Sequence, residues 1–421
     1  MLETISKQYH PKYIKNYDNF DKDKDTVLYS GPYWDHQELH AMLESILEGD
    51  WIVSGLKVEK FQHEFSKMFN VKYSHMVNSG SSANLTMITA LKKHFSWQDG
   101  DEIIVSPVGF PTTIAPIVQN NLKPVFIDIE FETLNFDVNL IEKNITEKTK
   151  AIIVSPVLGN PPDMDRIKQI CEMHNLVLVG DNCDSLGTTY KGKHIAEYYF
   201  SSSCSFYPAH HISTGEGGMV SSNNKEFIDT VRSISWWGRD CYCVGINNTL
   251  CNGTCGKRFS RWLPNYDNVI DHKYVYGNIG YNLKPLDLQG AVGSVQLTKM
   301  QEIDFKRRTY KQIIENALVK HVGITPVKTV DGADPSWFGI PIVCVDVDQK
   351  RFLVDHFESN RIQTRNYFCG NILLHPAYEH LDDYKKFPNA NKVLDTVFFI
   401  GCSPLYNEAV LDYIVEVIEK W

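Results

Sequence analysis

The stretch Ser205-Phe-Tyr-Pro-Ala-His210-His211-Ile-Ser-Thr-Gly-Glu-Gly217-Gly218 combines a serine, two adjacent histidines and a glycine-rich end, and it contains no lysine. Short apolar runs precede it and alternate with helical patterns. Near-continuous apolar strands that alternate with helices are typical of a parallel sheet buried on both faces. The runs that predict strands are 102–106, 124–128, 151–155 and 176–180. The sequence therefore predicts an α/β fold with a mostly parallel sheet.

The same pattern predicts the division of the chain into domains. We expect an N-terminal arm over residues 1–35, a large α/β domain over 36–295, and a smaller α+β domain with its linking helix over 296–421. One long helix is expected over 288–322. With 421 residues, of which 43% are hydrophobic, the chain can bury cores of this size.

Charge and composition argue against several classes of partner. The net charge of −9 and the pI of about 5.9 do not favour a nucleic-acid surface. No apolar run approaches the roughly 18 residues of a membrane helix, and the N-terminus lacks the apolar core of a signal peptide. Ten cysteines without a secretion signal predict reduced thiols and a cytoplasmic protein.

Three segments place small, acidic or aromatic residues where strands are expected to end. Asn78-Ser-Gly80-Ser81-Ser82 opens a helix, so its backbone N–H groups could bind a phosphate, or its serines could simply cap the helix. Asp181 could keep a proton on a pyridine nitrogen, or it could cap a loop. Phe110 could stack on a flat cofactor ring, or it could belong to the core.

Four cysteines have a spacing that indicates a metal centre. Cys183 stands alone, and the Cys241-Tyr-Cys243 pair and Cys251 follow in a polar, loop-like segment over residues 238–258. Four such thiolates hold a 2Fe–2S cluster, although four cysteines also bind structural zinc. Cys255 is expected to be a nearby free thiol.

Together these motifs resemble the sugar aminotransferase family, which has the fold-type I architecture of enzymes dependent on pyridoxal phosphate (PLP). The resemblance runs from about residue 55 to 401. It implies that the cofactor phosphate is bound by Gly80, Ser81, Ser82 and Ser205. It further implies that Phe110 stacks on the ring and that Asp181 contacts the pyridine nitrogen. Asn282, in Gly280-Tyr281-Asn282, would reach the partner's cofactor phosphate in a homodimer.

One departure from the family pattern concerns the lysine that forms a Schiff base with the cofactor. It lies five residues after the phosphate-binding serine and seven before the Gly-Gly pair, and both counts lead to His210. An imidazole cannot form a Schiff base, because that bond needs a primary amine. The cofactor implied is therefore pyridoxamine phosphate (PMP), held without a covalent bond.

The resemblance implies an activity for this lysine-to-histidine change. Two enzyme types that share it remove the 3-hydroxyl group of a nucleotide-linked 4-keto-6-deoxy sugar. One carries a 2Fe–2S cluster on four cysteines at this spacing and acts on a CDP-linked sugar, in the synthesis of 3,6-dideoxyhexoses for bacterial surface polysaccharides. The other has no cluster and acts on a GDP-linked sugar. The four cysteines favour the first type.

The implied roles complete the prediction. His210 would remove a proton from the cofactor, and Tyr207 would lie near the ring. Electrons would come from a flavin- and iron–sulfur-containing reductase. The residues expected to meet the nucleotide sugar are His211, Tyr281 and Arg365. A regulatory protein on the same fold is a further alternative, and a conventional aminotransferase is disfavoured because position 210 is not lysine.

Overall fold

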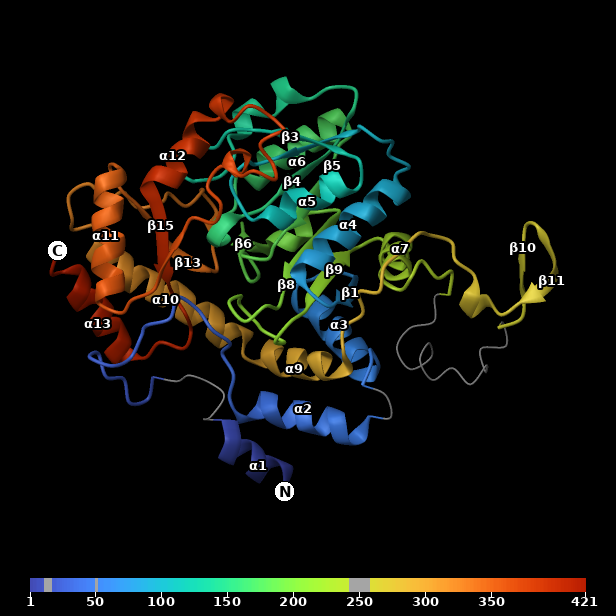
Figure 1. Ribbon diagram of the computed structural model, residues 1–421, viewed down its shortest axis with the longest axis horizontal. Helices are drawn as coiled ribbons and strands as arrows, with labels where there is room; N and C mark the ends of the chain where they lie inside the picture. The colour runs from blue at the N-terminus through green and yellow to red at the C-terminus, as the bar shows by residue number, and fades with distance from the viewer. Residues whose placement is uncertain (11–16, 50–51, 242–257) are drawn as a thin grey trace.

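The computed structural model describes residues 1–10, 17–49, 52–241 and 258–421. Its centre is a seven-stranded sheet (Figure 1). In their order across the sheet, the strands are β1 (Tyr73–Val77), β9 (Gly218–Ser222), β8 (Ser201–Ser205), β5 (Val177–Asp181), β4 (Thr149–Val154), β2 (Glu102–Val105) and β3 (Lys123–Phe126). Neighbours from β8 to β3 run parallel, whereas β9 is antiparallel to both β8 and β1. The predicted α/β fold with a mostly parallel sheet is confirmed.

Helix α3 (Leu56–Met68) precedes β1. The helices that follow strands of this sheet are α4 (Gly80–His94), α5 (Pro111–Gln119), α6 (Met164–His174) and α7 (Lys225–Ser235). Helix α4 follows β1 and packs on β8 and β9. Ser79 caps α4, because its hydroxyl oxygen accepts a hydrogen bond of 3.1 Å from the N–H group of Ser82.

The C-terminal part begins with two helices, α9 (Asp287–Thr298) and α10 (Met300–Leu318), so the prediction of one long helix is wrong. The helix is interrupted at Lys299, whose N–H group bonds to the carbonyl oxygen of Gln296 in a tighter turn. An antiparallel sheet follows, in the order β13 (Gly339–Val343), β15 (Val397–Gly401) and β14 (Thr364–Asn366). The helices described in this C-terminal part after α10 are α11 (Val347–Ser359), α12 (Pro388–Thr396) and α13 (Glu408–Ile418).

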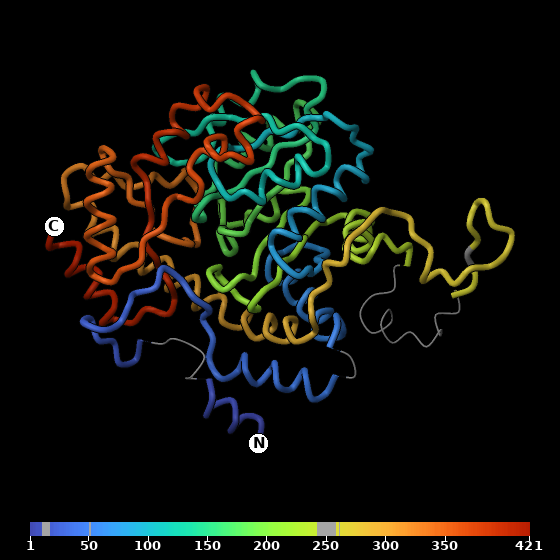
Figure 2. Tube along the Cα trace, in the orientation of Figure 1, coloured from blue at the N-terminus to red at the C-terminus, as the bar shows by residue number. Residues whose placement is uncertain are grey.

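The N-terminal residues contact both large parts of the molecule. Helix α1 (Leu2–Tyr9) packs on α2 (His36–Glu48), which packs on α9. Between them the chain passes along the C-terminal part, where Val27 pairs with Ile362 (Figure 2). The described residues 17–35 are thus held by contacts with the rest of the molecule.

Two smaller sheets complete the fold. One consists of β12 (Ala333–Asp334), β6 (Thr189–Tyr190) and β7 (Lys193–His194). The other is a hairpin of β10 (Arg261–Leu263) and β11 (Tyr266–Ile270), which projects from the body beyond α7 (Figure 2). Among the helices described, none is long and apolar enough to cross a membrane.

Candidate active site

A cavity of about 360 Å³ lies where the carboxyl ends of β5 and β8 meet the N-termini of α4 and α5. This edge is where sheets of parallel strands bind their ligands. Eight of the residues predicted from the sequence line the cavity, namely Gly80, Ser81, Phe110, Asp181, Cys183, Ser205, Tyr207 and His210. The structure therefore brings together segments that are up to 130 residues apart in the chain.

The wall that could hold a phosphate is formed by the N-terminus of α4 and the end of β8. A Cβ atom added to Gly80 would lie 2.4 Å from the Cβ atom of Ser205 and 2.7 Å from its hydroxyl oxygen. Only glycine therefore permits this approach between the two segments. The positive end of α4 and the nearby hydroxyl groups suit an anion such as a phosphate.

Replacing Gly80 with alanine is expected to weaken binding of a phosphate-bearing cofactor at least about tenfold. The added methyl group must displace Ser205, at a stability cost of about 1–3 kcal/mol. Equilibrium dialysis of the cofactor and thermal unfolding measure the two effects. Gly277→Ala is the control, because the nearest atom to its added Cβ would be 3.5 Å away. Unchanged affinity in Gly80→Ala would show that this turn does not hold the phosphate.

Asp181 ends β5 and is only 5% exposed. Its Oδ2 atom accepts hydrogen bonds from the Asn84 amide (2.9 Å) and from the Thr113 hydroxyl group (2.6 Å). The backbone N–H group of Cys183 donates to Oδ1 at 3.3 Å. These bonds fix the carboxylate at the cavity wall, where it could accept a further hydrogen bond from a protonated ring nitrogen.

Two aromatic side chains line the cavity and are about half exposed, Phe110 and Tyr207. Phe110 precedes the first turn of α5, where Pro111 begins the helix. Its ring meets that of Phe368 edge-on, with 6.1 Å between the ring centroids. Phe110 is therefore not a core residue, and its remaining face is available to a flat ligand.

His210 lies in the loop between β8 and β9, residues 206–217, which we call the histidine loop. Its ring lies 5.2 Å from that of Phe338 and 6.5 Å from that of Tyr207, measured between centroids. Burial and the positive charge of Arg307 lower the pKa of His210 to about 3. The imidazole is consequently neutral at neutral pH, which is the state a general base has before it takes up a proton.

Asp184 is a cavity residue that sequence reasoning missed. Its Oδ1 atom lies 3.5 Å from Nδ1 of His210, but the two atoms do not form a hydrogen bond. Burial, and to a smaller extent the negative charge of Asp181, raises the pKa of Asp184 to about 7. The sequence could have indicated Asp184 by its position, because it directly follows Cys183 in the loop after a predicted strand. Among the described residues that line the cavity, three are carboxylic acids and none is lysine or arginine.

Two of the four cysteines predicted to bind a cluster lie within the described residues. Cys183 lines the cavity, and burial and the nearby charge of Asp181 raise its thiol pKa well above the usual range. Cys241 is buried and follows the α7 segment, at the start of the cysteine-rich loop. Neither forms a disulfide. Cys243, Cys251 and Cys255 lie outside the described residues, so the ligand set remains a prediction.

Several predicted site residues do not line the cavity of this chain. Ser82 contributes to the cap of α4, and His211 is 1% exposed, with Nε2 2.8 Å from the carbonyl oxygen of Ser336. Tyr281 and Asn282 lie on the exposed segment after the hairpin. Arg365 does not line the cavity itself, but its guanidinium group packs 4.3 Å from the centre of the ring of Tyr29, which does.

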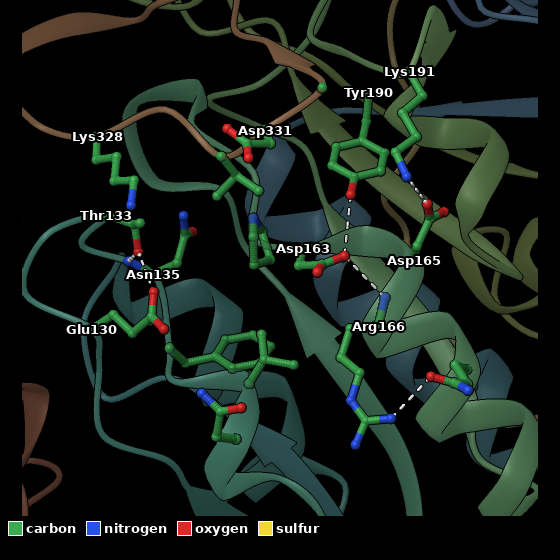
Figure 3. A pocket seen from close by; sticks show the side chains of 17 residues that line it. Glu130, Thr133, Asn135, Asp163, Asp165, Arg166, Tyr190, Lys191, Lys328 and Asp331 are labelled. Carbon is green, nitrogen blue, oxygen red and sulfur yellow. Dashed lines mark hydrogen bonds and ion pairs between the residues drawn. The ribbon is translucent and has the colours of Figure 1, made fainter.

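A larger cavity, of about 870 Å³, lies between α6 and the β6–β7 turn (Figure 3). Many of its polar groups bond to one another: the Tyr190 hydroxyl group donates to Asp163 at 3.1 Å, and Lys191 pairs with Asp165. None of the residues predicted for the site lines it. The smaller cavity, with its histidine and acidic groups, is therefore the candidate active site.

Comparison with known proteins identifies the family of this chain. Residues 34–419 match the DegT/DnrJ/EryC1/StrS aminotransferase family. The chain is 39% identical over 402 residues to dTDP-4-dehydro-2,6-dideoxy-D-glucose 3-dehydratase of Saccharopolyspora spinosa, covering 93% of this chain and 86% of that protein. It is 36% identical to the lipopolysaccharide biosynthesis protein RfbH of Salmonella typhimurium, covering 93% and 91%.

A solved structure extends the likeness to three dimensions. It is the E. coli GDP-4-keto-6-deoxy-D-mannose-3-dehydratase with bound hydrated PLP, at a TM-score of 0.81 and 28% identity, covering 93% of this chain and 99% of that one. Sequence and structure thus lead to the same group of proteins. The chain belongs to the DegT/DnrJ/EryC1/StrS aminotransferase family and is an enzyme of its sugar 3-dehydratase and aminotransferase group.

Proposed function

We propose that this enzyme removes the 3-hydroxyl group of a nucleotide-linked 4-keto-6-deoxyhexose with PMP as its cofactor. The observation that carries the proposal is that His210 lines the cavity, while no described lining residue is lysine. The resemblance implies that His210 stands where the family has its lysine. A neutral imidazole can accept a proton but cannot bind the cofactor covalently. Two of the relatives similar to this chain are named as sugar 3-dehydratases.

The residues present fit this cofactor. Gly80, Ser81 and Ser205 would hold the phosphate, Phe110 would stack on the ring, and Asp181 would keep the ring nitrogen protonated. When bound, PMP supplies a primary amine for the ketone of the sugar and a ring that takes up electrons.

His210 is the proposed base for the proton on the C4′ carbon of the cofactor. Phe338 and Tyr207 pack around its ring, and Asp184 lies near Nδ1. A proton on Nδ1 would leave Nε2 as the nitrogen that accepts one. Tyr207, which is half exposed at the cavity, is placed to contact the ring.

The overall reaction replaces a C–O bond by a C–H bond. The hydroxyl group at C3 leaves as water, and two electrons and two protons are consumed. We propose that the electrons come singly from a flavin- and iron–sulfur-containing reductase through a 2Fe–2S cluster. Its ligands would be Cys183, Cys241, Cys243 and Cys251, and the position of Cys183, two residues after Asp181, would place the cluster beside the cofactor.

Cys183→Ser is expected to reduce bound iron and sulfide from about two of each per chain to near zero. Protein purified without oxygen would be assayed for iron, zinc and sulfide, and after reduction by electron paramagnetic resonance for a spin-half signal. Cys171→Ser is the control, because that thiol is buried on α6, away from the site. Zinc in the wild type, or full iron content in Cys183→Ser, would contradict the cluster.

The nucleotide is proposed to be CDP, so that the activity is that of a CDP-4-keto-6-deoxy-D-glucose 3-dehydrase in 3,6-dideoxyhexose synthesis. Arg365, at the edge of the cavity beyond Tyr29, could pair with the diphosphate. The other residues proposed to contact the substrate are His211 and Tyr281. The alternative is a cluster-free reaction on a GDP-linked sugar, and the E. coli enzyme that this chain resembles is named for a GDP-linked substrate.

The proposed function is tested with CDP-, dTDP- and GDP-linked 4-keto-6-deoxyhexoses, PMP and a chemical reductant. Mass spectrometry should show loss of one oxygen atom from the hexose, fastest with the CDP-linked substrate. An amine at C4 in place of the ketone would identify an aminotransferase and contradict the proposal. Deoxygenation of the GDP-linked sugar without a reductant, with glutamate as amine donor, would identify the cluster-free alternative.

A homodimer is the proposed assembly. The cofactor phosphate and the nucleotide diphosphate are anionic, yet the described lining of the cavity holds acidic groups and no lysine or arginine. Asn282 and its neighbour Lys284, on the exposed segment after the hairpin, could supply polar and positive groups to the partner's site. Sedimentation equilibrium measures the assembly.

A further inference from the structure

The histidine loop is held by side chains from two distant parts of the chain, residues 30–34 and 296–307. The loop has no regular structure but is largely buried, so its backbone groups need hydrogen-bond partners. The hydroxyl group of Ser30 donates to the carbonyl oxygen of Ala209 at 2.6 Å, and the Arg307 guanidinium group donates to that of His210 at 3.4 Å. These two bonds flank the imidazole proposed as the base.

Ser213, three residues after His210, is held at both of its backbone groups. Its N–H group donates to the side-chain oxygen of Gln296 at 3.0 Å. Its carbonyl oxygen accepts from the indole N–H group of Trp34, also at 3.0 Å. Ser213 and Gln296 are fully buried, so water cannot replace the bond between them.

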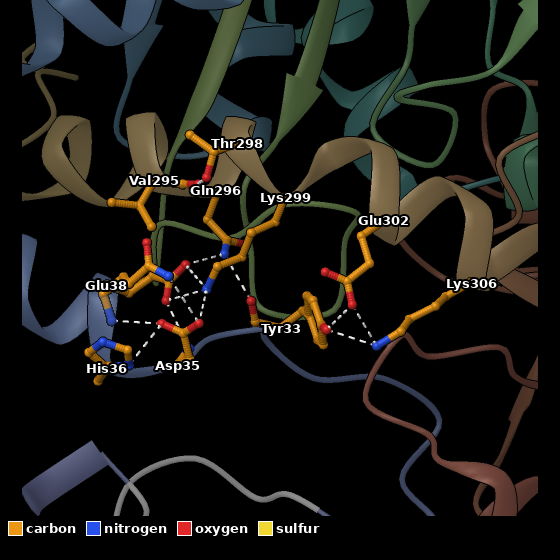
Figure 4. A network of polar contacts seen from close by, with 11 residues as sticks. Tyr33, Asp35, His36, Glu38, Val295, Gln296, Thr298, Lys299, Glu302 and Lys306 are labelled. Carbon is orange, nitrogen blue, oxygen red and sulfur yellow. Dashed lines mark hydrogen bonds and ion pairs between the residues drawn. The ribbon is translucent and has the colours of Figure 1, made fainter. Parts of the chain in front are cut away.

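The orientation of the Gln296 amide is fixed by groups that can only accept hydrogen bonds. Its NH₂ group donates to the Glu38 carboxylate at 2.7 Å and to the Tyr33 carbonyl oxygen at 2.9 Å. Glu38 is fully buried and pairs with Lys299 at 2.7 Å (Figure 4). Since the NH₂ group must face these acceptors, the amide oxygen must face Ser213.

We infer that Gln296 is a positioning residue for His210, and that the segment from Ser30 to Glu38 is a working part of the active site. This inference rests on the proposed role of His210. The buried ion pair of Glu38 and Lys299 holds the amide, the amide and Trp34 hold Ser213, and Ser213 fixes the histidine loop. A base displaced by about 1 Å can lose about 100-fold in rate, so this support is expected to affect proton transfer.

The test compares Gln296→Met with Trp34→Phe, which removes the indole N–H group and keeps a smaller aromatic ring. In the cofactor-free protein, hydrogen–deuterium exchange of the peptide covering residues 206–217 should be at least tenfold faster in both variants. In the PMP-loaded enzyme, release of deuterium from C4′ should fall about 10- to 100-fold, with KM for the sugar changed less than threefold. Lys306→Met is the control: Lys306 bonds to Tyr33 and Glu302 but not to the loop.

Two results would overturn the inference. One is exchange of the 206–217 peptide at the wild-type rate in both variants. The other is faster exchange with unchanged release of deuterium from C4′, which would make the contacts structural only. A wild-type protein that releases no deuterium would instead contradict the proposed function, and the exchange rates would still decide whether Gln296 and Trp34 hold the loop. If Gln296→Met does not fold, Trp34→Phe alone still tests the inference.

Discussion

His210→Asn is expected to lower the turnover number by about 10²- to 10⁴-fold, the range for loss of a general base. The asparagine side chain is similar in shape to one side of the imidazole ring, but its amide cannot accept the C4′ proton of the cofactor at neutral pH. The cofactor should still bind, because Gly80, Ser205 and Asp181 are unchanged. Steady-state deoxygenation and the visible spectrum of bound cofactor measure the two effects.

Two further variants sharpen this prediction. His210→Lys should allow a covalent Schiff base and gain transamination while losing deoxygenation, since it restores the family's amine. His356→Asn on α11 is the control, because its ring lies outside the cavity and bonds to the carbonyl oxygen of Val417. Deoxygenation within threefold of wild type in His210→Asn would show that another group is the base.

Asp181→Asn is expected to slow turnover by about 10²- to 10³-fold, as for loss of a preorganised electrostatic contact. The amide would no longer stabilise a proton on the pyridine nitrogen, so the ring would take up electrons less readily. The bonds from Asn84 and Thr113 can persist on the amide oxygen, and only the longer bond of 3.3 Å from the Cys183 N–H group is lost, so the fold should be retained. Pre-steady-state measurement of C4′ proton release separates this effect from substrate binding.

Asp163→Asn is the matched control, since this acid lies in the larger cavity and caps α6. It should leave turnover unchanged and affect only stability, by about 1 kcal/mol or less. Wild-type turnover in Asp181→Asn would mean that this carboxylate does not contact the ring nitrogen, and the proposed orientation of the cofactor would be wrong.

The sheet was predictable where its strands are apolar, and less so elsewhere. The runs at 102–106, 124–128, 151–155 and 176–180 correspond to β2, β3, β4 and β5. Strand β8 reads Ser-Ser-Ser-Cys-Ser and has no apolar pattern, yet all five residues are buried. Its side chains are satisfied by distant groups, as where Ser203 donates to Asn84. Such contacts follow from tertiary structure and leave no local signal.

The site was predictable to the extent that strand ends and motif spacing define it. Asp181, Ser205 and His210 all line one cavity, as the order of the motifs indicated. Asp184 was missed because a second acid after a strand end has no pattern of its own. The support from Gln296 was also missed, since it depends on contacts with Glu38 and Ser213, which lie far away in the chain.

The most direct test of the central claim is the fate of deuterium at C4′ of PMP. The cofactor, labelled at that carbon, is bound to wild-type enzyme and mixed with the CDP-linked 4-keto-6-deoxyhexose. We expect label release to solvent in the wild type, loss of that release in His210→Asn, and no covalent cofactor on the chain after borohydride treatment. Equal release by both proteins, or cofactor fixed to a lysine, would contradict the account.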